Sequence, residues 1–242
     1  MMRKGIFMAF MAVMMMTAGT GARAQETGGM KWKVEETVSR RDAEAYGIGR
    51  CFRSMEIPDD VFRRMKGRSF KGYCTVARSS LRYLRMLHYD LEGKIKVGEM
   101  VCHKDVAKDL LSIFRNLFDA RYPIERMRLI DDYGADDERS MAANNTSCFN
   151  FRYVAGTRVA SNHSWGRAVD VNPLYNPCVK RRRNGTVDVS PKNGRRYADR
   201  SRNFSCKIDK SDLLYKEFIR HGFVWGGSWK SLKDYQHFEK KK

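Results

Sequence analysis

The chain has 242 residues, 42% of them hydrophobic, and a formal net charge of +19. This length and hydrophobic content fit one domain with an ordinary core and a small extension. So large a positive charge draws a protein to polyanions, which for an exported protein are anionic cell-wall polymers, lipid headgroups or acidic substrates. Nucleic acid is not an expected partner, because no RNA- or DNA-binding motif accompanies the charge and the basic residues are spread along the chain.

The first 24 residues have the layout of a secretory signal peptide. Arg3 and Lys4 precede the apolar run Ile6–Met16, and Ala-Arg-Ala at 22–24 forms a small-x-small cleavage site. The run is shorter than the roughly 20 residues that a membrane span needs. We therefore expect cleavage after Ala24, export, and no transmembrane segment in the mature chain.

Six cysteines follow this segment, and an even number in an exported protein favours disulfides. They are Cys51, Cys74, Cys102, Cys148, Cys178 and Cys206. Six cysteines allow 15 pairings, and the sequence does not choose among them. One candidate is Cys178–Cys206, which closes the basic loop between them. Metal binding by the cysteines is disfavoured because no Cys-x-x-Cys pair occurs.

The first half of the chain is predicted to be mainly helical. Residues 25–74 form a polar, basic extension with some helix signal, followed by the main domain over 75–242. Leucines at helical spacing predict a helix over Arg78–Leu91, and the apolar face of His103–Arg121 predicts a second helix that Pro123 stops. Met127–Ile130 is predicted to be a strand, and Asp131–Asn145 a loop.

Strands dominate the second half. Short strands are predicted over Phe149–Val154 and Val159–His163 around a Gly156 turn, over Ala168–Asn172, and over Phe223–Trp225 and Tyr235–Glu239. A helix over Leu213–His221 begins after a cap at Asp209 or Ser211. Residues 173–207 are too long for an ordinary connection, so this basic segment is either a solvated charge run or a substrate-facing rim. Helices first and strands later, without regular alternation, predict an α+β fold with a central antiparallel sheet.

Two segments, Ser161–Asn172 and Asp234–Glu239, hold the residues that can carry chemistry. His163 and Asp170 are seven residues apart, which on a helix is about 10 Å of rise, too far for two ligands of one Zn²⁺ ion. The chain must therefore turn back at Gly166, as strand, turn and strand. His237 completes the two imidazoles and one carboxylate of a catalytic zinc site, with one position left open for water.

Asp234 lies three residues before His237 and can take a proton from the water that such a zinc activates. A lone His-x6-Asp or Asp-x-x-His pattern is common by chance, so spacing alone does not establish the site. His88, His103 and His221 lack any comparable context and are interpreted as surface, helix-end or capping residues. Trp225 and Trp229 flank two glycines near the site and either pack in the core or form a wall of the cleft.

The pattern Ser-x-His-x-x-Gly-x-Ala-x-Asp at 161–170 resembles the signature of the zinc D-alanyl-D-alanine carboxypeptidase family, peptidase family M15. The flanks that carry the same resemblance are 123–124, 145–152, 170–177, 225–229 and 234–239. The resemblance extends over roughly residues 75–240. The resemblance implies a compact α+β domain shared with phage cell-wall endopeptidases and the hedgehog signalling domain.

The resemblance also implies roles for residues. His163, Asp170 and His237 correspond to the zinc ligands, and Asp234 to the general base. Asp234 stands where some members have glutamate and phage L-alanyl-D-glutamate endopeptidases have aspartate, which leaves open the bond that is cleaved. Arg152 matches the arginine that steadies the charge on the scissile carbonyl, with a structural ion pair as the alternative. Ser161 supports the substrate or the segment of His163.

These observations predict an exported bacterial zinc metallopeptidase, periplasmic or extracellular, that hydrolyses peptidoglycan stem peptides. A D-alanyl-D-alanine carboxypeptidase is the first interpretation and an L-alanyl-D-glutamate-type endopeptidase the second. A cell-wall-binding module that keeps its zinc without turnover is the non-enzymatic alternative. The presence of Asp234 argues against that module, since a protein that only binds needs no base there.

Overall fold

The computed structural model describes residues 30–154 and 157–241. The expected signal peptide and the Gly156 turn lie outside these residues. The α-helices are α1 (Arg40–Tyr46), α2 (Asp59–Met65), α3 (Lys104–Asp119), α4 (Asp137–Ala142) and α5 (Leu213–Arg220). The 3-10 helices are η1 (Ile48–Cys51), η2 (Arg78–Ser80), η3 (Ile130–Tyr133), η4 (Asn162–Trp165), η5 (Lys192–Tyr197) and η6 (Gly226–Ser228). The strands are β1 (Thr37–Val38), β2 (Arg53–Met55), β3 (Leu81–Tyr89), β4 (Ile95–His103), β5 (Arg126–Met127), β6 (Asn145–Thr146), β7 (Ala168–Asp170), β8 (Cys178–Arg181), β9 (Val187–Ser190), β10 (Val224–Trp225), β11 (Lys233–Asp234) and β12 (His237–Glu239).

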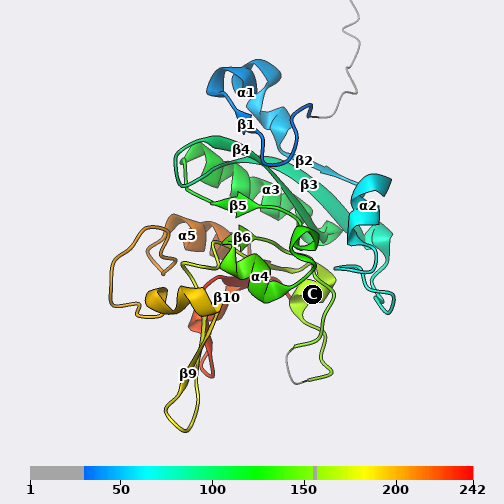
Figure 1. The fold of residues 1–242 in the computed structure, drawn as a ribbon. Coiled ribbons are helices and arrows are strands. Elements are labelled where there is room, and N and C mark those ends of the chain that lie inside the picture. The colour runs from blue at the N-terminus through cyan, green and yellow to red at the C-terminus, as the bar shows by residue number, and fades with distance from the viewer. Residues whose placement is uncertain (1–29, 155–156, 242) are drawn as a thin grey trace, which may run out of the picture.

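The strands form an antiparallel sheet in the order β1-β4-β3-β2 and several smaller sheets. Figure 1 shows the larger sheet and α3 above, with α4, α5 and the later strands below. The small sheets β10-β12-β7 and β11-β8-β9 are also antiparallel, whereas β5 and β6 pair in parallel. The predicted α+β fold class is confirmed.

The prediction of a helix over Arg78–Leu91 is wrong, because Leu81–Tyr89 is the long central strand β3. It pairs along its whole length with β4 through a hairpin whose turn lies at 90–94. Nearly every residue of β3 is buried, which means that both faces of the strand are covered. A strand buried on both faces has no alternating pattern, so its leucines fall at helical spacing by coincidence.

The prediction of a helix over His103–Arg121 is confirmed by α3. Its buried face consists of Val106, Ala107, Leu110, Ile113, Phe114, Leu117 and Phe118. The His103 ring caps the helix by accepting a hydrogen bond from the Asp105 amide at 3.2 Å. This face packs with β3, β7, α5 and β12 in the largest apolar cluster, so the core lies between the larger sheet and the strands that hold the site.

Several loops contain more structure than predicted. The expected loop Asp131–Asn145 includes most of η3, all of α4 and the start of β6. Segment 173–207 contains the hairpin of β8 and β9, followed by η5. The two strands expected on either side of Gly156 are reduced to one bridge between Tyr153 and Ala160. Helix α5 begins at Leu213 as predicted, but its cap is Asp212 instead of Asp209 or Ser211, because the Asp212 side chain accepts from the amides of Leu214 and Tyr215.

Residues before 75 supply both outer strands of the larger sheet. Strand β1 pairs with β4, and β2 pairs with β3. Met65 of α2 is completely buried, in a cluster that also contains Phe149 and Phe151. The extension therefore packs directly against the segment that leads to the predicted site. In the described residues no helix is long and apolar enough to cross a membrane.

All six cysteines are free in this structure, so the expected disulfides are not present. Cys178 lies beside Asp234 on the neighbouring strand, since the two residues are partners in the pairing of β8 with β11. The Cys206 sulfur lies 3.6 Å from the Ser205 hydroxyl, and burial raises the pKa of this thiol. The candidate pair Cys178–Cys206 is therefore not formed, because Cys178 lies beside Asp234 and Cys206 lies beside Ser205.

His88 is buried on β3, which corrects its interpretation as a surface, helix-end or capping residue. Its Nδ1–H donates to the Ile124 carbonyl at 2.8 Å, while its Nε2 is buried and has no hydrogen-bond partner among the described residues. Burial lowers the pKa of His88 to about 4 from an ordinary value of 6.5. The ring is therefore neutral in the folded protein at pH values where the unfolded chain already binds a proton.

We expect His88 to make the fold sensitive to acid. As pH falls from 6.5 to 4, protonation of the unfolded chain alone should lower the free energy of unfolding by up to about 3 kcal/mol. Chemical denaturation of the chelated protein at several pH values, compared with His88→Gln, measures this contribution. The variant should show a shallower loss of stability over this window, whereas His221→Gln at the end of α5 should behave like the wild type. Equal slopes for His88→Gln and wild type would contradict the assignment.

Candidate metal centre and active site

The three predicted metal ligands come together from two adjacent strands and one 3-10 helix. Strand β12 pairs with β7 in a register that places His237 directly opposite Asp170. His163 lies in η4, shortly before β7. The three side chains are buried, with no more than 13% of any of them exposed. Antiparallel pairing thus joins residues that are 67 positions apart in the chain.

The turn between His163 and Asp170 is built differently from the predicted strand, turn and strand. His163 lies within the 3-10 helix η4, which Ser161 caps by accepting a hydrogen bond from the His163 amide at 3.3 Å. Gly166 ends this helix in the left-handed conformation, at φ 64°. The expected reversal at Gly166 is confirmed, and the strand that follows is β7. The Ser161 hydroxyl therefore holds the His163 segment in place.

The three side chains form a compact triangle, in which Asp170 faces His163 with Oδ2 and His237 with Oδ1. His163 Nε2 lies 3.2 Å from His237 Nδ1 and 3.3 Å from Asp170 Oδ2, and His237 Nδ1 lies 3.0 Å from Asp170 Oδ1. Tetrahedral coordination with bonds of about 2 Å has edges of about 3.3 Å. The triangle is therefore the size of one face of a zinc coordination shell.

Hydrogen bonds behind the triangle set the tautomer of each imidazole. His163 Nδ1 lies 2.7 Å from the Cys148 carbonyl, which can only accept, so Nδ1 carries the proton and Nε2 faces the centre with a lone pair. His237 Nε2 lies 3.1 Å from the Glu239 carboxylate and donates to it, which leaves Nδ1 to face the centre. Glu239 is itself held by Asn162 Nδ2 at 2.6 Å.

Such outer partners are typical of metal-ligating histidines, since they orient the ring and raise its basicity. Glu239 belongs to the 234–239 segment singled out in the sequence, but no role was predicted for it. The Cys148 carbonyl carries no signal in the sequence, because backbone acceptors do not depend on residue type. The donor set and its outer shell therefore fit a Zn²⁺ ion held by His163, Asp170 and His237.

The electrostatics of the triangle are those of a site made for a cation. Burial alone would raise the pKa of Asp170, but His163 and His237 outweigh it and hold the pKa well below its usual range. Burial alone would lower the pKa of His237, but hydrogen bonds to Asp170 and Glu239 outweigh it and raise the pKa to about 10. The carboxylates thus favour positive charge on this centre.

Asp234 stands beside the triangle on β11, where it pairs with Cys178 of β8. Its Oδ1 accepts a hydrogen bond from Gln236 Nε2 at 3.2 Å. Burial raises the pKa of Asp234 to about 6, against the opposing effect of His237. A carboxyl group with a pKa in this range can both accept and release a proton near neutral pH.

The two glycines after Trp225 allow the strands of the site to approach one another. A Cβ on Gly226 would lie 2.8 Å from the Asp234 carbonyl and 3.2 Å from the His237 Cβ. A Cβ on Gly227 would lie 2.3 Å from the Trp225 ring. Trp225 is buried in the core, whereas the Trp229 ring lies 5.1 Å from His237 and lines the cavity. Trp225 therefore packs in the core, and Trp229 forms a wall of the cleft.

A cavity of about 630 Å³ opens over the triangle. It is lined by Asp137, Glu138, Met141, Arg152, Val154, Val159, Ala160, Ser161, Asn162, His163, Asp170, Cys178, Ser190, Trp229, Leu232, Asp234, Gln236, His237 and Glu239. All six predicted site residues thus line one cavity. Within it, Arg152 forms an ion pair with Asp137 at the start of α4. The ion pair that was the alternative role for Arg152 is therefore formed.

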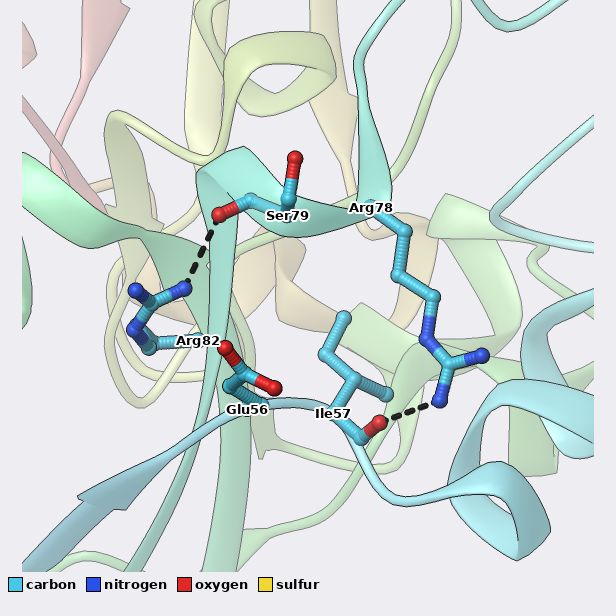
Figure 2. A pocket seen from close by; sticks show the side chains of 5 residues that line it. All are labelled: Glu56, Ile57, Arg78, Ser79 and Arg82. Atoms are coloured by element: carbon cyan, nitrogen blue, oxygen red, sulfur yellow. Dashed lines mark hydrogen bonds between the residues drawn. The ribbon is translucent and has the colours of Figure 1, made fainter.

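A second cavity, of about 410 Å³, lies at the far end of β2 (Figure 2). It is lined by Glu56, Ile57, Arg78, Ser79 and Arg82. Figure 2 shows both arginines turned back onto backbone carbonyls, Arg78 onto Ile57 and Arg82 onto Ser79. None of these five residues is a histidine or a cysteine. The positive charges of Arg78 and Arg82 are offset by Glu56 and by Asp59, which forms an ion pair with Arg78.

Residues 155–240 match the family model described as D-alanyl-D-alanine carboxypeptidase. This part of the chain, about a third of its length, is similar to that family. The match includes the three metal ligands, Ser161 and Asp234, but begins after Arg152, and it is narrower than the expected range of 75–240. No curated protein and no solved structure matches the chain. The cluster of His163, Asp170 and His237, which could hold a metal ion, lies within the matched residues.

Proposed function

We propose that this protein is a zinc-dependent peptidase that hydrolyses peptidoglycan stem peptides, as a D-alanyl-D-alanine carboxypeptidase. The observation that carries the proposal is the cluster of His163, Asp170 and His237, with contacts of 3.0 to 3.3 Å between their side chains, in one cavity with the partly buried acid Asp234. The match to the carboxypeptidase family supports the choice of substrate.

The residues divide the chemistry among them. His163, Asp170 and His237 would hold the zinc ion, which when bound would supply Lewis-acid activation of a water and of the scissile carbonyl. Asp234 accepts a proton from the attacking water and passes it to the leaving amine, for which its raised pKa is suited. Arg152 places a fixed positive charge in the cavity for the oxygen that becomes negative during attack. Asp137 holds this guanidinium in position.

Two further points belong to the proposal. We infer that the protein is exported to the periplasm or beyond, from the layout of its first 24 residues. Its net charge of +19 would also favour contact with anionic cell-wall polymers. Fusion of residues 1–30 to a reporter that is active only outside the cytoplasm tests the export signal.

Digestion of defined muropeptides, with products identified by mass spectrometry, tests the activity. We expect release of D-alanine alone from pentapeptide substrates, complete loss with a chelator, and recovery on addition of zinc. Cuts near the muramyl end would instead identify an L-alanyl-D-glutamate-type endopeptidase, which the aspartate at position 234 keeps as the second candidate. A zinc-loaded protein that forms no product would leave only the cell-wall-binding module.

A further inference from the structure

Exposed apolar side chains gather at one edge of the cavity. Four of the eight large hydrophobic residues that are exposed in the described part of the chain are Tyr73, Tyr153, Val154 and Val159. Val154 and Val159 line the cavity, and the Val154 amide donates to the Val159 carbonyl at 2.8 Å. Single exposed apolar residues are common, but a contiguous patch marks a surface that contacts something.

The two tyrosines form a pair of parallel rings, which we call the platform and define as Tyr73 and Tyr153. Their rings lie parallel within 2°, with centroids 6.3 Å apart. The buried Phe151 ring stands edge-on to both, at 5.8 Å from Tyr73 and 6.4 Å from Tyr153. The tyrosines remain 56% and 47% exposed. The core thus holds both rings in place while much of their surface faces solvent.

Two hydrogen bonds join the segment of Tyr73 to the segment of Tyr153. The Phe151 amide donates to the Ser69 carbonyl at 3.0 Å, and Lys71 Nζ donates to the Phe151 carbonyl at 2.7 Å. Tyr73 is therefore held by the segment after α2, outside the part of the chain that matches the peptidase family. Little conformational freedom remains to be lost when a ligand binds such a surface.

The platform and the cavity lie on opposite sides of one extended segment. Phe151 and Tyr153 contact Tyr73, whereas the alternate residues Arg152 and Val154 line the cavity. Tyr153 also pairs with Ala160, another residue of the cavity wall. A ligand that leaves the cavity over this edge therefore meets the platform next.

We propose that the platform binds a sugar ring of the glycan to which the stem peptide is attached. The inference rests on the proposed function, since a stem peptide seated in the cavity is joined to a sugar at one end. The C–H face of a pyranose is apolar and slightly positive, which complements the negative face of an aromatic ring. Both tyrosines are exposed enough for such a contact.

Kinetics with two substrates test this proposal. One is the free stem peptide, and the other is the same peptide attached to its disaccharide. Tyr73→Ala should raise KM for the disaccharide-peptide by about tenfold, the size of one aromatic contact, and leave kcat and the free peptide unaffected. Tyr73→Phe should retain wild-type KM. Leu91→Ala, in the β3–β4 turn, is the matched loss of another exposed apolar side chain.

A rise of KM for both substrates, or for neither, would overturn the proposal. A second measurement does not depend on turnover: NMR titration of the zinc-loaded protein with a peptide-free N-acetylated amino-sugar oligosaccharide. Wild type should bind this probe and Tyr73→Ala should not, even if the protein cuts no stem peptide. Stronger, salt-sensitive binding of single-stranded DNA that Tyr73→Ala removes would instead assign the platform to base stacking.

Discussion

Replacing Asp234 with asparagine should reduce kcat by about 10²- to 10⁴-fold, the range that a positioned proton carrier contributes, while zinc content stays at the wild-type level. The amide keeps the shape of the side chain and its contact with Gln236, but it cannot accept a proton. The ligand triangle does not include Asp234, so metal binding should persist. Turnover of a defined muropeptide and metal analysis of the same sample measure both quantities.

Two controls make this result specific. Asp188→Asn changes an acid of the same three-stranded sheet that is paired with Arg182 outside the cavity, and it should leave kcat unchanged. In the wild type, kcat/KM should fall as pH drops below about 6, because protonation of Asp234 removes the base. A bound cation nearby lowers this pKa further. Full activity of Asp234→Asn would remove the residue from the mechanism.

Replacing Gly166 with alanine should destabilise the fold by about 3 to 5 kcal/mol and weaken zinc binding. The residue has φ +64°, and an added Cβ would lie 2.6 Å from the His103 amide nitrogen and 2.9 Å from the Cys102 carbonyl carbon. Backbone strain and overpacking each cost about 1 to 3 kcal/mol. Because the Gly166 carbonyl accepts from the His103 amide at 2.8 Å, relief of the clash must move the His163 turn away from the end of β4.

Gly93→Ala is the matched control for this prediction. Gly93 has a similar φ of +74°, but an added Cβ meets nothing within 4 Å. It should therefore show only the cost of the backbone conformation, about 1 kcal/mol, and no change in zinc binding. Chemical denaturation of the chelated proteins gives the stabilities, and competition with a chromogenic chelator gives the affinities. Equal losses in both variants would contradict the role of close packing at Gly166.

The ligand set could be predicted because its chemistry is local in the sequence. A histidine and an aspartate seven residues apart, with a glycine between them, cannot meet one ion on a helix, so the turn followed from geometry alone. The turn has a 3-10 form because the Ser161 hydroxyl caps it. The tautomers could not be predicted, since they depend on a backbone carbonyl of Cys148 and on Glu239.

The fold was less predictable where burial hides periodicity. Strand β3 is covered on both faces, so its apolar residues do not alternate and the leucine spacing indicated a helix. The amphipathic helix α3, with one buried face, was predicted almost to its ends. The hairpin of β8 and β9 was not predicted, because each strand has only four residues, too few to show a clear alternating pattern.

By itself, the sequence predicted the α+β class, and it singled out His163, Asp170, His237 and Asp234 from their residue types, their spacing and the resemblance of the segments that contain them. The tertiary structure decided the features that depend on contacts between residues far apart in the sequence. The register of β12 on β7 places His237 opposite Asp170, and burial raises the pKa of Asp234 to about 6. Packing of the extension brings Tyr73 alongside Tyr153, a contact between residues 80 positions apart that no local pattern encodes.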